Sequence, residues 1–280
     1  MTSTFPTPTK EEWRRRVEDE LGPGRDFDRA LVARTLEDLP IQPLYTAEDG
    51  GGLAATVTPR SGGWTIAQRV AHASPRIANA RLLAELTQGA TGCLLALDSA
   101  GSGVSVAGLH DLDILLDGVY LDAIPIAFGT SAEGLPLAAT FVALCRERDV
   151  DPARVRAHFG MDPIAALAAD GTLPGDVDDA RRELCLLAEH SRLELDRSRS
   201  LAVDAGVWHR AGGHAVLELG YALASFVEML RWLEASGLPP AAAHSEFVWR
   251  MDVGRDVFTE IAKLRAARAV HARVLGSSGV

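Results

Sequence analysis

The chain has 280 residues, of which 47% are apolar, and it carries a formal net charge of -10. This length and apolar content suffice for a sizeable core, and they fit one large domain with an arm better than two equal domains. The negative charge argues against a nucleic-acid partner, because the sequence contains no basic block that would neutralise phosphates.

The first part of the chain, residues 1–60, is predicted to form an extended arm that contains one helix. Thr9 can cap a helix over residues 10–21, with Glu12 at the capping-box position, and a Gly-Pro-Gly sequence ends that helix. The prolines of the segment LPIQPLY then favour extended backbone.

Targeting signals and metal motifs are not evident in the sequence. The N-terminus has no apolar run after its basic residues, and no stretch approaches the ~18 uninterrupted apolar residues of a membrane span. Cys93, Cys145 and Cys185 are isolated within apolar runs and show no metal-ligand spacing. We therefore expect a cytoplasmic protein with reduced thiols, no bound metal and no membrane partner.

Short apolar runs alternate with longer helical patterns throughout residues 61–280. The runs predict strands over 64–70, 92–98, 123–129, 156–160, 200–205 and 245–250. The helical patterns lie over 75–88, 110–117, 132–148, 163–170, 176–191, 212–235 and 254–275. Such alternation predicts an α/β fold with a parallel sheet and right-handed crossovers.

The spacing of units, about 36 residues, favours a TIM-barrel-like (β/α) fold. A doubly wound open sheet is disfavoured, because no glycine-rich phosphate turn follows the first strand. Only about six βα units are found, whereas a barrel needs eight, so the predicted barrel is incomplete. Its two sheet edges need a cover. The N-terminal arm, a second chain or the rest of a longer polypeptide are the alternatives, and we expect self-association or a partner.

Several phrases of the sequence follow one another in a recognisable order. They are ARTLEDLPIQPLYT at 33–46, GWTIAQ at 63–68, ANARLLAELTQGATGCLLALD at 78–98, VDAGVWHRAGG at 203–213 and FTEIAKLRAAR at 258–268. Together they resemble the methylmalonyl-CoA mutase family, nearest to the small, non-catalytic subunit of its heterodimeric enzymes. The resemblance covers roughly residues 25–275 and lacks the last two barrel strands and the cobalamin-binding domain.

The resemblance implies an acyl-CoA site along the barrel axis, and the substrate contacts of the active subunit are altered here. That subunit has a WTIRQY-like first strand, whereas this chain reads WTIAQR, with Ala67 at the arginine position and Arg69 at the tyrosine position. A QND-like turn, with an arginine eight residues past its aspartate, corresponds here to Gly160–Asp162 and to Asp170. A carboxylate at that position would repel an anionic acyl group.

One family position is kept, because His209 matches the histidine that follows the fifth strand. The resemblance implies a hydrogen bond from His209 to a thioester carbonyl, and the alternative is a histidine satisfied by backbone or water. The family's Asp-x-His-x-x-Gly cobalamin loop is incomplete, since Val207 replaces its aspartate. We expect no cofactor on this chain alone; adenosylcobalamin is implied only for the family's full complex.

Further candidate substrate contacts lie in two regions of the chain. Thr65, Gln68 and Arg69 belong to the first strand, and Lys263 and Arg265 belong to the last helix, where Arg268 adds a third cation. We expect any acyl-CoA site near the carboxyl ends of the strands. The helix cations would contact a CoA phosphate or a partner, or else lie solvated on the surface.

Two functions remain open from the sequence. The first is a supporting subunit for a large mutase subunit, related to an isomerase without being a mutase alone. The second is a free-standing, cobalamin-independent enzyme of a biosynthetic pathway that binds an acyl-CoA or another acyl thioester and uses His209 as acid or base.

Overall fold

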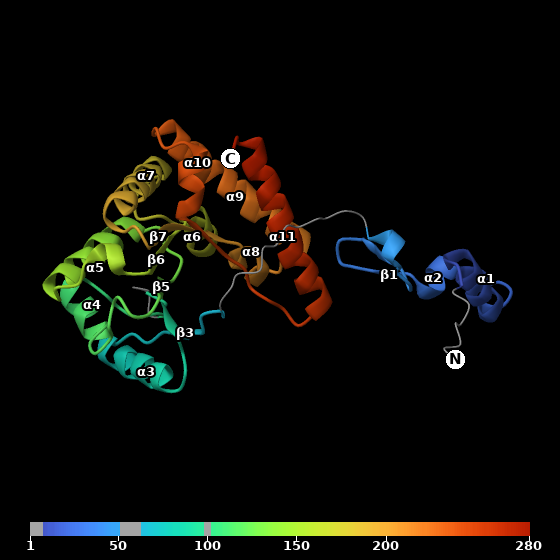
Figure 1. Ribbon diagram of the computed structural model, residues 1–280, viewed down its shortest axis with the longest axis horizontal. Helices are drawn as coiled ribbons and strands as arrows, with labels where there is room; N and C mark the ends of the chain where they lie inside the picture. Colours follow the sequence, from blue (N-terminus) through green and yellow to red (C-terminus); the bar gives the residue numbers. More distant parts are fainter. Residues whose placement is uncertain (1–7, 51–62, 98–101) are drawn as a thin grey trace, which may run out of the picture. The chain divides into compact units, whose positions relative to one another are not determined.

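The computed structural model describes residues 8–50, 63–97 and 102–280 (Figure 1). The chain divides into two compact units, residues 1–56 and 57–280. The first unit contains helix α1 (Lys10–Leu21), helix α2 (Phe27–Leu31), strands β1 (Ala33–Arg34) and β2 (Pro40–Ile41), and the 3-10 helix η1 (Ala47–Asp49).

Helix α1 begins where the sequence predicts it. The Thr9 side chain accepts a hydrogen bond from the Glu12 amide at 3.2 Å, and the Glu12 carboxylate accepts one from the Thr9 amide at 2.9 Å. This capping box satisfies amides that have no partner within the helix. The prediction of a capped helix over residues 10–21 is therefore confirmed.

The rest of this unit is more structured than an extended arm. Asp26 caps α2 by accepting a hydrogen bond from the Arg29 amide at 2.8 Å, and β1 pairs with β2 in antiparallel orientation. Trp13 and Phe27 pack edge to face with ring centroids 6.1 Å apart. The expectation of a single helix was wrong, because local capping and one aromatic contact are enough to order short elements here.

The second unit is built on a six-stranded sheet in which every neighbouring pair is parallel. Its order follows the chain: β3 (Ala67–Val70), β4 (Gly92–Leu95), β5 (Ile126–Phe128), β6 (Ala157–Met161), β7 (Arg199–Asp204) and β8 (Phe247–Arg250). All six predicted strands are present, although most are shorter than the apolar runs. The α/β, TIM-barrel-like and incomplete architecture is therefore confirmed, with β3 and β8 at the edges.

The helices of this unit lie around the strands (Figure 1). They are α3 (Pro75–Thr87), α4 (Leu109–Leu115), α5 (Gly134–Glu147), α6 (Pro163–Asp170), α7 (Val177–Glu194), α8 (Gly206–Arg210), α9 (Ala215–Ala235), α10 (Pro240–Ala243) and α11 (Val257–Ser277), with 3-10 helices η2 (Pro152–Arg154) and η3 (His244–Glu246). The prediction of one helix over 212–235 was wrong at its start, because α9 begins only at Ala215. Gly212 has a φ of 90°, which interrupts the helical backbone, and His214 then caps α9.

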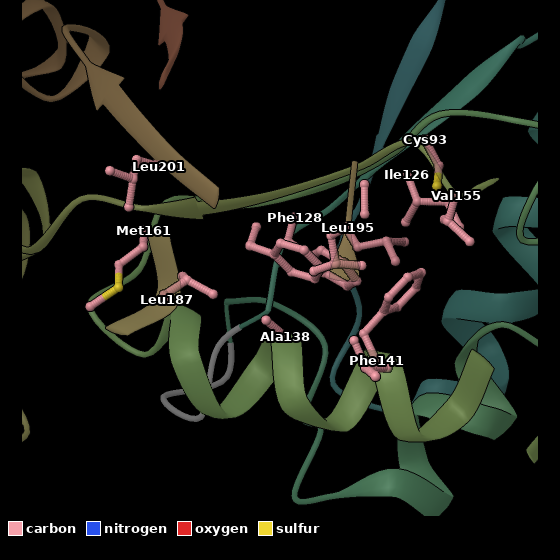
Figure 2. Packing of buried hydrophobic residues seen from close by; sticks show 14 of the residues in the cluster. Cys93, Ile126, Phe128, Ala138, Phe141, Val155, Met161, Leu187, Leu195 and Leu201 are labelled. Atoms are coloured by element: carbon pink, nitrogen blue, oxygen red, sulfur yellow. The ribbon is translucent and has the colours of Figure 1, made fainter. Parts of the chain in front are cut away.

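The core lies between the sheet and the helices. Phe128 of β5, Phe141 of α5 and Phe159 of β6 are fully buried, and their ring centroids are 5.7–5.9 Å apart. Figure 2 shows Phe141 and Ala138 reaching from α5 toward Phe128. Close-packed aromatic rings of this kind bury much apolar area and fix α5 on the sheet.

The strand register places a different row of residues on the opposite face. Arg69 pairs with Leu94, Leu94 with Ala127, and Ala127 with His158, so these four lie in one row across β3 to β6. Side chains alternate along a strand, and Phe128 points toward α5. Arg69 and His158 therefore face away from the helix layer.

The thiols behave as structural apolar side chains. Cys93 and Cys145 are buried and unbridged, and burial raises their pKa to about 12 and about 11 respectively. Cys185 is half-buried and also free. The prediction of buried cysteines is confirmed for Cys93 and Cys145, and the raised pKa of each of these thiols disfavours its reactive thiolate form.

Candidate functional site at the carboxyl ends of the strands

A pocket of about 760 Å³ opens at the carboxyl ends of β3 to β6. Arg69, Glu133 and Asp170 supply its charged side chains, and Thr130 and Ser131 supply hydroxyl groups. Two of the positions that depart from the active-subunit pattern, 69 and 170, thus line one pocket. Among the described residues, one guanidinium and two carboxylates line this pocket, so its described lining carries an excess of negative charge.

Behind this pocket, Arg250 joins three strands through hydrogen bonds. Its Nη1 donates to Thr130 Oγ1 at 2.9 Å, and its Nη2 donates to the Phe128 carbonyl. Thr130 Oγ1 in turn donates to Asp204 Oδ2 at 2.6 Å. Burial lowers the pKa of Arg250, while the nearby carboxylates act against that shift. The Arg250 guanidinium is therefore engaged in hydrogen bonds within the protein itself.

Gly160 makes room for this arrangement. The β6–β7 register shifts between His158 and Met161, and Gly160 has a φ of 68° in that stretch. A Cβ at this position would lie 2.7 Å from the Gly129 carbonyl oxygen and 2.8 Å from Arg250 Nη2. The strand therefore requires glycine there, both for its backbone conformation and for the close approach of Arg250.

Asp162 is a second buried carboxyl group at this edge. It is 1% exposed and accepts hydrogen bonds of 2.9 Å from the amides of Ala165 and Asp204. The first bond caps α6. Burial nevertheless raises the pKa of Asp162 to about 6, and the Asp204 carboxylate adds to the effect.

His158 lies in the same row as Arg69, on the face of the sheet that points away from the helix layer. Burial lowers the pKa of His158 to about 4, and Arg250 and Arg199 act in the same direction. The imidazole is therefore neutral at physiological pH. Neither His158 nor Arg250 stood out in the sequence, because only the fold brings Arg250 to Thr130, which lines the pocket, and His158 into the same row as Arg69.

A separate charged cluster joins α9 to α11. Lys263 Nζ lies 2.8 Å from Glu218 Oε2, 2.6 Å from Glu260 Oε2 and 2.7 Å from the Asp252 carbonyl oxygen. The Lys263 and Glu218 side chains are fully buried. Burial opposes the charge on Lys263, but its hydrogen bonds to the two glutamates prevail and raise its pKa.

His209 belongs to this second cluster. It lies in α8, its Nδ1 is 3.3 Å from Glu218 Oε2, and its side chain is 31% exposed. Glu218 was missed by sequence reasoning. A signal was available, because Glu218 interrupts the apolar face of a long helix, where a carboxylate needs a buried partner.

The predicted contact residues do not form one site. Arg69 lines the pocket, whereas Lys263 is buried in the second cluster and Arg265 lies exposed on α11. Gln68 is exposed on β3. Thr65 precedes β3 and touches Gly92, the first residue of β4. The expectation that Thr65 lies at the carboxyl ends was wrong, because parallel strands that begin together place it at the amino edge.

Two further properties concern the described residues only. Within residues 8–50, 63–97 and 102–280, no group of three or more His, Cys, Asp or Glu residues is suited to hold a metal ion. In the same ranges, no helix combines the length and apolarity required to cross a membrane.

Comparison with known proteins gives a consistent set of relatives. The family model for methylmalonyl-CoA mutase matches residues 34–278. The methylmalonyl-CoA mutase small subunit of Streptomyces virginiae is 36% identical, covering 100% of this chain and 47% of the relative. The small subunit of Propionibacterium freudenreichii subsp. shermanii is 29% identical, with 98% and 45% covered. The large subunit of Streptomyces virginiae is 26% identical, with 96% and 41% covered. The chain thus spans less than half the length of these relatives.

Proposed function

This chain belongs to the methylmalonyl-CoA mutase family, and from that premise we propose that it is a non-catalytic chain supporting a large catalytic subunit. Identity supports the proposal, since the chain is 36% identical to the small subunit of Streptomyces virginiae and 26% identical to the large subunit of the same organism. The rearrangement of an acyl-CoA carbon skeleton would then take place on the partner.

The charge of the pocket is the observation that carries this proposal. Arg69 faces Glu133 and Asp170, so an anionic acyl group entering the pocket meets net repulsion. Arg250, beside the pocket, is already engaged with Thr130, and Lys263 is engaged with Glu218 in the separate cluster.

Cobalamin fits the residues of this chain poorly. Adenosylcobalamin supplies the radical that starts the family's rearrangement, and a histidine ligates its cobalt in the family. Here His209 contacts Glu218, and the apolar, buried Val207 stands where the family loop has its aspartate. We infer that the partner, and not this chain, holds the cofactor.

The test compares the purified chain, the Streptomyces virginiae large subunit and their mixture, each with adenosylcobalamin and methylmalonyl-CoA. We expect no succinyl-CoA from the chain alone. In analytical ultracentrifugation, the mixture should contain a species heavier than either component. Product formation by the chain alone would overturn the non-catalytic role, and the absence of a mixed species would overturn the supporting role.

A second candidate function rests on the His209–Glu218 pair. A buried carboxylate that orients a partly exposed imidazole is the arrangement of a general base and its positioning group. This favours a cobalamin-independent enzyme that acts on an acyl thioester. Acetyl-CoA is a suitable probe, because it is an acyl thioester whose acyl group carries no charge.

Calorimetry distinguishes this candidate from the first. If His209 donates a hydrogen bond to the thioester carbonyl, His209→Ala should weaken acetyl-CoA binding by ~1–2 kcal/mol. His110→Ala changes an exposed histidine elsewhere on the unit and serves as the control. Equal affinity for wild type and His209→Ala would make the histidine structural, and no binding by either would eliminate the enzyme.

A further inference from the structure

The carboxylate of Glu218 lies between two nitrogen atoms in the cluster that joins α9 to α11. Its Oε2 is 2.8 Å from Lys263 Nζ and 3.3 Å from His209 Nδ1. The Glu218 side chain is fully buried, and its other oxygen, Oε1, has no hydrogen-bond partner among the described residues. One buried oxygen therefore serves both nitrogens, and the position of each hydrogen atom follows from what each group is able to donate.

Lys263 fixes Glu218 as a hydrogen-bond acceptor. Besides Glu218, the Lys263 Nζ lies 2.6 Å from Glu260 Oε2 and 2.7 Å from the Asp252 carbonyl oxygen, so three oxygen atoms surround an ammonium group with three N–H bonds. A buried ammonium group requires anionic partners. Glu218 is therefore ionised, and an ionised carboxylate only accepts hydrogen bonds.

The contact with Glu218 selects one tautomer of the neutral His209 ring. Neutral histidine carries a single ring hydrogen, on Nδ1 or on Nε2, and its partners decide which. Because Glu218 only accepts, the hydrogen belongs on Nδ1. The other tautomer would place a nitrogen lone pair 3.3 Å from a carboxylate oxygen. The Nε2 atom is then an acceptor, and none of the described residues forms a hydrogen bond to it.

The Nε2 edge of the His209 ring is accessible. The His209 side chain is 31% exposed, although the carboxylate beside its Nδ1 is fully buried. Gly254, in the loop between β8 and α11, lies next to the outer edge of the ring. A Cβ at that position would lie 3.5 Å from His209 Cε1 and 3.8 Å from Nε2. Because glycine has no side chain, this space stays open to a ligand.

We propose that Glu218, held by Lys263, keeps neutral His209 in the Nδ1–H tautomer, so that Nε2 receives a proton from a thiol or hydroxyl group of a bound ligand. His209 is the residue that contacts the ligand, and Glu218 and Lys263 are positioning residues. The tautomer rests on the contacts of the cluster alone. The class of ligand rests on the second candidate function, in which His209 acts on an acyl thioester.

The proton transfer is balanced within the site. The S–H or O–H bond of the ligand breaks, its electron pair stays on sulfur or oxygen, and the proton forms an N–H bond at Nε2. The resulting imidazolium lies against the Glu218 carboxylate, which stabilises its charge. A thioester carbonyl oxygen is itself an acceptor, so only the imidazolium donates to it. Neutral His209 therefore favours a ligand group that donates, such as the free thiol to which an acyl group is transferred.

Nitrogen NMR of the intact, histidine-labelled chain measures the tautomer, because a ring nitrogen that carries hydrogen and one that does not have well-separated chemical shifts. The His209 signals are those that are missing from His209→Ala. At a pH where these spectra show His209 to be neutral, we expect the Nδ1–H form to exceed the Nε2–H form by about tenfold or more. Equal amounts of the two forms, or an excess of the Nε2–H form, would overturn the proposal.

Two matched variants of α9 test the positioning role of Glu218. Glu218→Leu removes the acceptor and should shift His209 to the Nε2–H form, which histidine favours in water. Glu234→Leu makes the same change at an exposed position of α9 and should keep the Nδ1–H form in excess. The same tautomer ratio in both variants and the wild type would show that Glu218 does not position the ring. If Glu218→Leu does not fold, the wild-type spectra still decide the tautomer.

Two probes test the class of ligand at the same pH. Coenzyme A, whose thiol is free, should move the His209 Nε2 signal toward the protonated shift, whereas acetyl-CoA, whose sulfur carries no hydrogen, should not. An equal response to both probes, or none to coenzyme A, would overturn the assignment of a donor ligand. Calorimetry shows separately whether the probes bind. If neither binds, the second candidate function falls, and a measured excess of the Nδ1–H form still supports the positioning role of Glu218.

Discussion

Arg250 Nη1 donates a hydrogen bond of 2.9 Å to Thr130 Oγ1, although the two residues are 120 positions apart in the sequence. This bond connects Arg250, the last residue of β8, with Thr130, which lies just after β5. It spans the two intervening strands, β6 and β7. It fixes the carboxyl edge of the sheet, where the pocket opens.

The variant Thr130→Val tests the Arg250–Thr130–Asp204 network. Valine keeps the shape of threonine but neither accepts from Arg250 nor donates to Asp204, so two polar groups lose a partner. We expect a loss of ~1–3 kcal/mol in the free energy of unfolding, measured by urea denaturation. Thr140→Val removes a hydroxyl that bonds only within its own helix and should change stability much less.

The variant Gly160→Ala tests the close approach at β6. The new Cβ would lie 2.7 Å from the Gly129 carbonyl oxygen, and the backbone has a φ of 68°. Gly171 has a φ of 74° with open space around it, so Gly171→Ala shares the backbone strain without the clash. We expect Gly171→Ala to lower the free energy of unfolding by about 1 kcal/mol and Gly160→Ala to lower it clearly more, as measured by thermal or urea unfolding. Equal losses would show that the contact with Arg250 is not tight.

The variant Asp162→Asn tests the effect of the buried carboxyl group on pH dependence. Burial raises the pKa of Asp162 from 3.8 to about 6, so the folded state binds the proton more tightly than the unfolded state does. This contribution to stability is fully present below about pH 4 and is lost as pH rises through about 6. A shift of this size corresponds to something on the order of 3 kcal/mol.

The free energy of unfolding of Asp162→Asn should therefore vary less between pH 4 and pH 7 than that of wild type. Urea denaturation at several pH values measures both. Asp176→Asn removes the carboxylate that caps α7 on the surface and should retain the wild-type pH dependence. If the free energy of unfolding of Asp162→Asn depended on pH as it does in wild type, another group would be the source of this pH dependence.

The variant Lys263→Met tests the cluster between α9 and α11. Methionine fills the same space but leaves the carboxylates of Glu218 and Glu260 buried without their cation. Breaking a buried pair in this way costs ~3–5 kcal/mol. Circular dichroism during urea unfolding measures the change, and Arg265→Met on the exposed face should stay within about 0.5 kcal/mol of wild type.

Neutralising all three groups distinguishes charge from packing. The triple variant Lys263→Met/Glu218→Gln/Glu260→Gln removes the unpaired charges and should recover part of the stability lost in Lys263→Met. If it does not, the loss in Lys263→Met arises from packing, and the cluster contributes little through its charges.

The sequence by itself determined the order of the strands and helices. Near-continuous apolar runs such as GCLLALD mark β4, and the capping residue Thr9 marks the start of α1, because these signals act over a few neighbouring residues. The family phrases likewise depend on residues close together in the chain. The incomplete barrel followed from counting such local units.

Only the tertiary structure decided which side chains meet. From the sequence alone, Lys263 could be a solvated cation on the surface. It is buried because Glu218, 45 residues earlier, offsets its desolvation cost. Arg69 and Asp170 line one pocket, whereas Thr65 lies at the opposite edge of the sheet. The register of parallel strands sets these placements, and register depends on long-range packing that a local pattern does not encode.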